Sequence, residues 1–164
     1  MIEAIPMSTT IRRLLILSAI LSATTARAGE SLGFRAGAAV VDVSPTSFPA
    51  IVNGGFLQAT ANSVRDPPSA RCVVLDDGST RVAIVVVDSC MMPRELIDEA
   101  KGIAARRTGI AFDRMLVSAT HTHSAPSVMG VLGTPLDPSY AATLPGKTAE
   151  EIEQAAASLA PAEA

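Results

Sequence analysis

The chain has 164 residues, of which 48% are hydrophobic, 18% are charged and only 3% are aromatic, and its formal net charge is -3. This length suits one domain, or one domain behind a processed leader. The slightly acidic balance and the scattered basic residues exclude the electrostatic footprint of a nucleic-acid-binding protein, so we expect no nucleic-acid partner. With no Trp and one Tyr, the core should consist of Val, Ile, Leu and Ala side chains.

The first 28 residues have the three parts of a secretory signal peptide. Arg12-Arg13 is a basic pair, residues 14–23 are an apolar run, and small residues at positions 26 and 28 suit signal peptidase. The run is too short to span ~30 Å of hydrocarbon, although an uncleaved anchor is the alternative. We expect a signal peptide over 1–28, a mature domain over 29–164, and a secreted or periplasmic protein.

The mature chain opens with a strand and a long irregular segment. Residues 36–43 predict a short strand, which Pro45 stops. Residues 44–70 carry four prolines and no periodicity, so we expect no regular structure there. Within this segment, residues 53–56 (Asn-Gly-Gly-Phe) would let the backbone approach another group closely, because glycine has no Cβ. An ordinary surface turn is the alternative.

A β-hairpin is the clearest local signal. Residues 71–75 and 81–88 flank the turn sequence Asp-Asp-Gly-Ser. The second arm is apolar throughout residues 82–87, which predicts a strand buried on both faces. Asp88 closes this strand, and a carboxylate in that place has to be hydrogen-bonded, ion-paired or metal-bound.

The two cysteines, Cys72 and Cys90, would meet an oxidising compartment after export, where a disulfide is allowed. The hairpin register argues against one, because a turn centred near residues 77–78 places Cys72 opposite a residue near Ala83. We therefore predict two free, half-buried thiols. Neither has a metal-ligand partner at close sequence spacing.

A helix and another strand follow the hairpin. Residues 93–107 have apolar side chains at helical spacing, with acidic residues early and basic residues late. Residues 114–120 form the next strand. Strand, helix and strand predict a βαβ crossover with two parallel strands. Asp88 and His121 then share the rim at the carboxyl ends of these strands, where open α/β sheets bind ligands.

The stretch after this strand holds the only two histidines of the chain, His121 and His123. Residues two apart on a strand point to the same face, so both imidazoles could converge on a metal ion or form an acid/base pair. Two polar residues on a solvated loop are the alternative. Asp88 could orient a ligating histidine, bind the metal itself, or cap the loop over residues 89–92.

The end of the chain predicts a loop and then a helix. Thr148 and Glu151 form a capping-box pattern that starts a helix running to about residue 159. Too few residues remain after it for a further parallel strand. The sequence therefore predicts an α/β fold: a mixed sheet with a β-hairpin and a βαβ crossover unit, forming the incomplete N-terminal part of a larger α/β domain.

Taken in order, these stretches resemble the neutral/alkaline, non-lysosomal ceramidases in their N-terminal catalytic domain. The resemblance rests on the opening strand over residues 37–45, the buried strand that ends at Val87-Asp88, and the sequence Ser-Ala-Thr-His-Thr-His-Ser over residues 118–124 before a proline. It covers roughly residues 33–160. The family usually has glycine after the last serine, where this chain has Ala125.

The resemblance implies a zinc-dependent amidase that hydrolyses the N-acyl bond of ceramide to a sphingoid base and a fatty acid. It implies that His121 is a Zn²⁺ ligand and that His123 lies beside the zinc and contacts the substrate. Asp88 is our further candidate catalytic residue on the same rim. Zinc polarises an amide carbonyl and lowers the pKa of its bound water toward ~7.

The family's remaining metal ligands, a histidine, a glutamate and a tyrosine, come from far downstream, and this chain has no third histidine. We therefore expect the chain alone to bind zinc weakly and to hydrolyse nothing. Its expected partners are a ceramide-like lipid amide, a membrane touched through that substrate, and the remainder of the catalytic domain if it is encoded downstream.

Two other functions stay open on the sequence alone. One is a metal-dependent hydrolase of the amidohydrolase type, in which a histidine-x-histidine pair follows the first strand of the fold. Here at least three expected strands precede the pair. The other is a small secreted, non-catalytic α/β domain whose histidines bind a metal ion.

Overall fold

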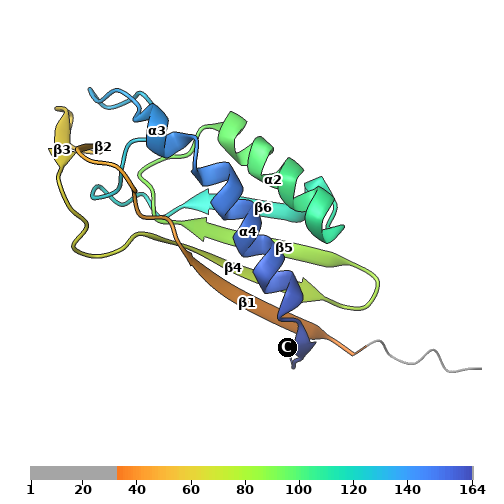
Figure 1. Ribbon diagram of the computed structural model, residues 1–164. Helices are drawn as coiled ribbons and strands as arrows, with labels where there is room; N and C mark the ends of the chain where they lie inside the picture. Colours follow the sequence, from red (N-terminus) through yellow and green to blue (C-terminus); the bar gives the residue numbers. More distant parts are fainter. Residues whose placement is uncertain (1–32, 164) are drawn as a thin grey trace, which may run out of the picture. The chain divides into compact units, whose positions relative to one another are not determined.

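Two long helices lie side by side on one face of a five-stranded mixed sheet (Figure 1). The computed structural model describes residues 33–163, so the expected signal peptide lies outside the described residues. The sheet contains β1 (Arg35–Asp42), β4 (Ser69–Asp76), β5 (Arg81–Val87), β6 (Met115–Ala119) and β7 (Ala160–Pro161). The other elements are β2 (Ala50–Val52), β3 (Ala59–Ala61), α2 (Arg94–Thr108), the 3-10 turn η1 (Phe112–Arg114), α3 (Pro138–Ala141) and α4 (Leu144–Ala157). The strand order in the sheet is β6-β5-β4-β1-β7.

The predicted hairpin and βαβ crossover are both present and confirm the α/β fold class. β4 and β5 pair antiparallel, and β5 pairs in parallel with β6 through the crossover helix α2. Cys72 pairs with Val85 rather than with Ala83, because the turn is centred one residue later, on residues 77–80. Cys72 and Cys90 are free thiols, as predicted, but both are buried rather than half-buried.

Helix α2 agrees with its prediction to within one residue at each end. It begins directly after Pro93 and ends at Gly109, which has a left-handed backbone (φ 73°) and donates its amide to the Ala105 carbonyl oxygen at 3.0 Å. Glycine adopts this helix-ending conformation at little cost. The buried residues of α2 are Ala100 and Ala104, and their small side chains let the helix lie against α4.

Helix α4 begins earlier than the capping-box pattern predicted. Pro145 lies in its first turn, while Thr148 and Glu151 are buried inside the helix rather than placed at its N-terminus. The prediction was wrong because proline suits a first helical turn, and the earlier start gives α4 one continuous buried stripe. Gly37 lets this stripe approach β1, since a Cβ at Gly37 would lie 2.2 Å from the Ala155 carbonyl oxygen.

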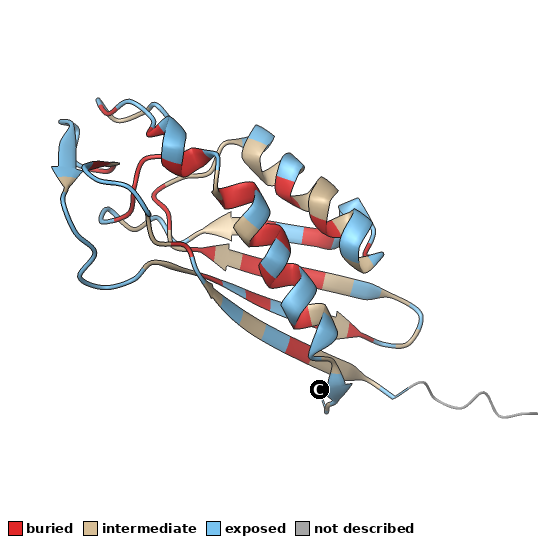
Figure 2. Cartoon of the chain, in the orientation of Figure 1, coloured by how far each residue is buried: buried red, intermediate tan, exposed pale blue. Residues whose placement is uncertain are grey.

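The prediction that residues 82–87 are buried on both faces was wrong. Ala83, Val85 and Val87 are buried, whereas Ile84 on the opposite face is 42% exposed. In the described part of the chain both long helices lie on the same side of the sheet, and burial alternates along the strands (Figure 2). The unbroken apolar run of β5 therefore supplies the core with one face only.

Apolar side chains on the other face form a row across three strands. Val73 pairs with Ile84, and Ile84 pairs with Leu116. Their exposed fractions are 42%, 42% and 60%. We call these three residues the apolar row. Sheets made only of parallel strands have both faces covered, whereas antiparallel sheets commonly leave one face to solvent, and in the described part of this mixed sheet the apolar row is exposed.

Residues 44–70 are more regular than predicted, because they contain β2 and β3, which pair antiparallel in a small separate sheet. The end of the described chain also differs from the prediction. Residues 160–161 form the short strand β7, which pairs antiparallel with the start of β1. Among residues 33–163, no helix is both long enough and apolar enough to cross a bilayer.

Candidate metal centre

The parallel strands β5 and β6 end at the same edge of the sheet. The Thr120 amide donates to the Val87 carbonyl oxygen at 3.0 Å and extends their pairing to the last residue of β5. The chain leaves this edge in two loops, residues 88–93 after β5 and residues 120–137 after β6. This is the edge at which open α/β sheets bind ligands.

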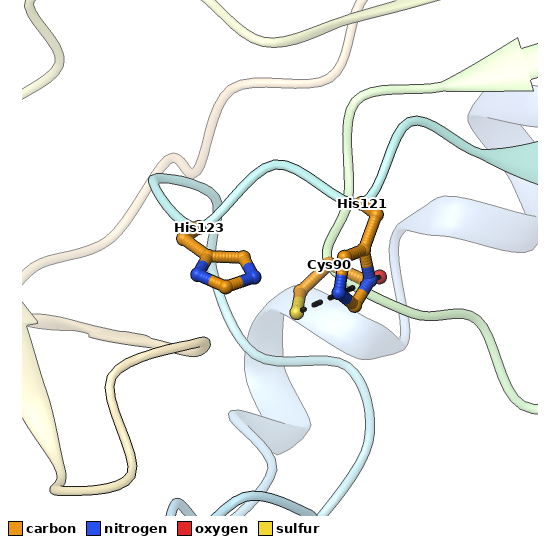
Figure 3. A group of neighbouring side chains, drawn as sticks. All are labelled: Cys90, His121 and His123. Atoms are coloured by element: carbon orange, nitrogen blue, oxygen red, sulfur yellow. Dashed lines mark hydrogen bonds between the residues drawn. The ribbon is translucent and has the colours of Figure 1, made fainter.

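Three side chains of these two loops converge at one point: Cys90, His121 and His123 (Figure 3). Their candidate ligand atoms all lie within 4.8 Å of one another. The two imidazole rings stand edge to face, with centroids 5.0 Å apart and planes inclined by 76°. Cys90 is buried and both histidines are exposed, so the cluster is open to solvent on its histidine side.

A hydrogen bond fixes the proton on the His121 ring. Its Nδ1 lies 2.7 Å from the Cys90 carbonyl oxygen. Because a carbonyl oxygen only accepts, Nδ1 carries the proton and donates, which leaves the Nε2 lone pair free. Metal-ligating histidines are commonly held in this way, with the second ring nitrogen donating to a backbone carbonyl. The sulfur of the same residue, Cys90 Sγ, lies 3.9 Å from Nδ1.

The two histidines converge through a turn of the loop rather than through strand geometry. β6 ends at Ala119, so the two-residue alternation of a strand does not apply to His121 and His123. His121 has φ 62°, a left-handed conformation that is uncommon outside glycine. Backbone strain of this kind clusters at functional sites. The imidazoles do meet, but the reason that the sequence suggested for it was wrong.

The glycine pair of residues 53–56 brings the backbone close to His123, which confirms the close approach predicted for this stretch. Gly54 has φ 111°, a conformation that favours glycine. A Cβ at Gly54 would lie 2.5 Å from His123 Cγ, whereas a Cβ at Gly55 would meet only the Leu57 carbonyl oxygen at 3.7 Å. Gly54 is therefore the position at which a larger side chain would displace the imidazole.

Asn53 joins the glycine loop to the loop that follows His123. Its side chain Nδ2 donates to Ser127 Oγ at 3.2 Å and to the Met129 carbonyl oxygen at 3.1 Å. Its backbone amide donates to the Ala125 carbonyl oxygen at 3.3 Å. Asn53 is only 2% exposed, so water does not replace these bonds easily. Sequence reasoning missed this clamp, and the one available signal was the position of Asn53 before two glycines.

Asp88 lies on the predicted rim but is not one of the three converging side chains. Its Oδ2 accepts from Arg71 Nη1 at 2.9 Å and from the Ser69 amide at 3.0 Å. Burial acts to raise the pKa of Asp88, but the Ser69 amide, the Arg71 guanidinium and the Thr120 side chain outweigh it and hold the pKa below its usual value. The carboxylate is thus both hydrogen-bonded and ion-paired, and its role in a reaction stays a prediction.

Cys90 is the cluster member that sequence reasoning missed. The sequence showed no metal-ligand partner for it at close spacing, because it lies 31 residues from His121. A signal was nevertheless available, since Cys90 follows β5 just as His121 follows β6, and the βαβ crossover brings the two strand ends together. Burial raises the pKa of the Cys90 thiol.

The donor set fits a zinc ion. Zinc prefers imidazole nitrogen and cysteine sulfur, and its catalytic sites hold three protein ligands with one position left open. Cys90, His121 and His123 supply two nitrogens and one sulfur, and the exposed histidine side leaves room for a further ligand. Within the described part of the chain, these are residues that could hold the ion.

A cavity of about 310 Å³ with both polar and apolar lining lies next to the histidine loop. It is bounded on the histidine side by Ser124 and Pro126. Its remaining lining comes from residues 45–68, where the apolar side chains include Phe48, Val52 and Val64. The cavity therefore adjoins the residue that directly follows His123.

Comparison with solved structures finds this fold in two ceramidase structures. The crystal structure of neutral ceramidase from Pseudomonas aeruginosa matches with a TM-score of 0.69 and 19% sequence identity, and a ceramidase complexed with C2 matches with a TM-score of 0.63 and 22% identity. Each match covers 79% of this chain and 22% of the other, so this chain spans about a fifth of the length of those proteins. No family model and no curated protein matches the sequence. The resemblance to the ceramidases is confirmed at the level of the fold.

Proposed function

We propose that this chain is the N-terminal portion of a zinc-dependent amidase of the neutral ceramidase type, which hydrolyses the N-acyl bond of a ceramide-like lipid amide. The observation that carries the proposal is the convergence of His121 and His123 at the shared edge of β5 and β6, on a fold that solved ceramidases share. The likeness of fold supports the choice of family, and the histidine pair supports the choice of chemistry.

His121 is the proposed metal ligand, through Nε2. Its Nδ1 is already engaged by the Cys90 carbonyl oxygen at 2.7 Å, so the ring is aimed before any ion arrives. Zinc bound at this position supplies Lewis-acid activation of the amide carbonyl.

His123 is the proposed catalytic residue that contacts the substrate. In amide hydrolysis the oxygen of water bonds to the carbonyl carbon, the C–N bond breaks, and the leaving nitrogen gains a proton. A neutral imidazole beside the substrate can accept the proton that the water loses and pass it to that nitrogen. Gly54 holds the His123 ring from one side, since even a Cβ there would lie 2.5 Å from Cγ, which suits a group that must keep its position.

Asp88 is proposed to act through the turn before His121. The Thr120 side chain contributes to the low pKa of Asp88, and the Thr120 amide is bonded to the end of β5. A carboxylate that stays ionised on this rim would keep the start of the histidine loop in place. Its contribution is therefore to positioning rather than to proton transfer.

The cavity beside Ser124 supports an apolar substrate. Its volume of about 310 Å³ and the Phe48, Val52 and Val64 side chains in its lining could take part of a hydrocarbon chain, while Arg65, Asp66 and Ser124 add polar groups to the same wall. A lipid amide whose carbonyl reaches the histidines would place one of its chains in or near this cavity. Contact with a membrane through the substrate is part of the proposal.

Export is also part of the proposal, on the basis of the signal-peptide pattern in residues 1–28. The remaining metal ligands of a ceramidase-type site are proposed to come from the rest of the catalytic domain. A non-catalytic metal-binding domain is the second candidate, and it is favoured by one observation: the described residues already contain three mutually close ligand atoms.

The test uses the complete polypeptide encoded at the same locus, with the chain of residues 1–164 as the reference. Zinc-dependent release of fatty acid from an N-acyl sphingosine should appear with the complete polypeptide and be lost in its His121→Ala variant. The His123→Ala variant should lose about 10²–10⁴-fold in rate. If the zinc-loaded complete polypeptide releases no fatty acid, the amidase proposal fails and the non-catalytic candidate takes its place.

A further inference from the structure

We infer that the edge of the sheet opposite the candidate metal centre carries a binding site for a phosphate group, formed by Arg35, Arg81 and Arg114. The inference goes beyond the proposed function and does not depend on it, because the length of β5 separates the two edges. The seven residues of β5, at ~3.3 Å each, place about 20 Å between Arg81 and the start of the loops that carry the histidines.

A cavity of about 740 Å³ lies at this edge of the sheet. Three stretches that are far apart in the sequence line it: the start of β1, the turn between β4 and β5, and the segment that joins α2 to β6. Figure 1 shows all three stretches at the end of the sheet where β4 turns into β5. The charged residues of the lining are Arg35, Asp76, Arg81 and Arg114.

The buried carboxylate of Asp76 holds two of the three arginines in place. Its side chain is 3% exposed, and its Oδ2 accepts from Arg81 Nε at 2.8 Å and from Arg35 Nη2 at 2.5 Å. Its Oδ1 accepts from the Gly78 amide at 2.7 Å. The Arg81 hydrogen bond is the largest of the causes that hold the pKa of Asp76 below its usual value. The carboxylate therefore stays ionised at neutral pH and keeps both guanidinium groups at the cavity.

The arginines keep hydrogen-bond donors that Asp76 does not use. Asp76 bonds Arg81 through Nε, which leaves the two Nη groups of Arg81 for another acceptor. The side chains of Arg35 and Arg81 are 41% and 43% exposed, so a ligand in solution can reach them. Within residues 33–163, Arg114 forms no ion pair, and its whole guanidinium group is available to a ligand.

The charge of the lining favours a doubly charged anion. Three guanidinium groups and one carboxylate leave a formal excess of two positive charges, and a phosphate monoester carries about −1.5 to −2 at pH 7. Phosphate oxygens also accept the paired N–H groups of a guanidinium in a bidentate manner. The Asp77 carboxylate of the adjoining turn is not part of the lining, and it already accepts from the Ser79 and Thr80 amides at 2.8 Å and 2.7 Å.

The experiment is a calorimetric titration of the full chain with inorganic phosphate at low ionic strength, where exposed charges are least screened. The natural chain should bind phosphate saturably, and Arg114→Gln should lose about 10-fold in affinity with the charge-assisted hydrogen bonds. Arg94→Gln is the matched control, because it removes the same charge at the start of α2, outside the cavity. Its exposed ion pair with Asp98 contributes little to stability, so phosphate binding should stay close to that of the natural chain.

Sedimentation with lipid vesicles identifies the source of the phosphate group. Vesicles of phosphatidylcholine, with and without phosphatidic acid, are compared for the natural chain and for Arg114→Gln. Attachment that needs both phosphatidic acid and Arg114 would assign the site to a lipid headgroup. Saturable binding of inorganic phosphate without such attachment would assign it to a soluble phosphate.

Three outcomes would overturn the inference. The first is a natural chain that does not bind phosphate saturably at millimolar concentration, a result that does not depend on whether any variant folds. The second is an equal loss of affinity in Arg114→Gln and Arg94→Gln, with native circular dichroism in both. The third is acetate, which carries a single charge, binding as tightly as phosphate. Arg114→Gln should leave zinc binding and amide hydrolysis unchanged, so a failure of this inference is distinguishable from a failure of the amidase proposal.

Discussion

His121 Nδ1 donates a hydrogen bond to the carbonyl oxygen of Cys90 at 2.7 Å, and this bond joins the loop after β5 to the loop after β6. This contact fixes both the tautomer and the direction of the His121 imidazole at the candidate metal centre. The surrounding loops are held by contacts that can be removed one at a time, which makes the arrangement testable.

Gly54→Ala should displace His123. The substitution places a methyl group 2.5 Å from His123 Cγ and forces a non-glycine residue into φ 111°. The left-handed backbone alone costs about 1–3 kcal/mol, and the displaced imidazole should weaken zinc binding by about 10–100-fold. Calorimetric titration with zinc measures the loss. Gly55→Ala is the control, because its Cβ meets nothing closer than 3.7 Å, and equal losses in both variants would contradict the proposed role of Gly54.

Asn53→Ala should loosen both loops at once. It removes two side-chain hydrogen bonds, one to Ser127 Oγ and one to the Met129 carbonyl oxygen, although that carbonyl keeps the Ser127 Oγ and the Val131 amide as donors. The free energy of unfolding should fall by about 1–3 kcal/mol, as measured by urea denaturation. Asn62→Ala, at an exposed position of the same long segment, should change it by less than about 0.5 kcal/mol. A loss at Asn53 no larger than the loss at Asn62 would show that the clamp is not needed.

Glu151 should make the protein less stable as the pH rises. Its carboxyl group is fully buried and has no hydrogen-bond partner in the described part of the chain. Burial raises its pKa to about 8, although Arg71 acts to lower it. Because the folded pKa lies above the unfolded value, the folded state holds the proton more tightly. The favourable contribution is complete below about pH 4.5 and is lost as the pH rises to about 8, with a total of a few kcal/mol at most.

Glu151→Gln separates this effect from the other carboxyl groups of the chain. The amide cannot ionise, so the variant should lose the fall in stability between about pH 4.5 and pH 8. Urea denaturation at several pH values measures the difference. Glu150→Gln, at the exposed neighbouring position, should keep the pH dependence of the natural chain. A Glu151→Gln chain that still loses stability over this range would place the titrating group elsewhere.

A charged substitution in the apolar row should cost little stability. A shortened side chain on the opposite, helix-covered face of the sheet should cost more. Leu116 is 60% exposed, while Val85 on the helix side is fully buried. Leu116→Lys should change the free energy of unfolding by less than about 1 kcal/mol, whereas Val85→Ala should cost about 2 kcal/mol through lost burial and a cavity. Sedimentation should also show less self-association for Leu116→Lys than for the natural chain, because the substitution makes the exposed apolar patch smaller. A cost at Leu116 equal to that at Val85 would mean that this face is covered.

Local sequence patterns sufficed for the hairpin, the crossover helix and the meeting of two strand ends at one rim. Each of these rests on residues near one another in the chain, such as the turn between β4 and β5 or the glycine that ends α2 at position 109. The burial of β5 was not predictable in the same way. An apolar run shows what a strand can bury, but the second face depends on which other element packs against it.

For a related reason, only the histidine pair of the candidate site could be predicted from the sequence. His121 and His123 are only two positions apart in the sequence, so their proximity was visible, whereas Cys90 joins them only through the parallel pairing of β5 and β6. The left-handed backbone of His121 (φ 62°) could also not be predicted, because the residue type alone does not indicate a positive φ. Asn53 and Gly54 approach the site from a different segment of the chain. The glycine pair in the sequence indicated a close contact there, but it did not indicate that His123 would be the partner.

The position of Cys90 and His121 at the two ends of the crossover has a consequence for the helix between them. The hydrogen bond from His121 Nδ1 to the Cys90 carbonyl oxygen closes a loop of 31 positions that contains all of α2. A metal ion bound at His121 would hold this ring in place and so strengthen the closure, and the slowest amide hydrogens of α2 should exchange more slowly when the metal is present.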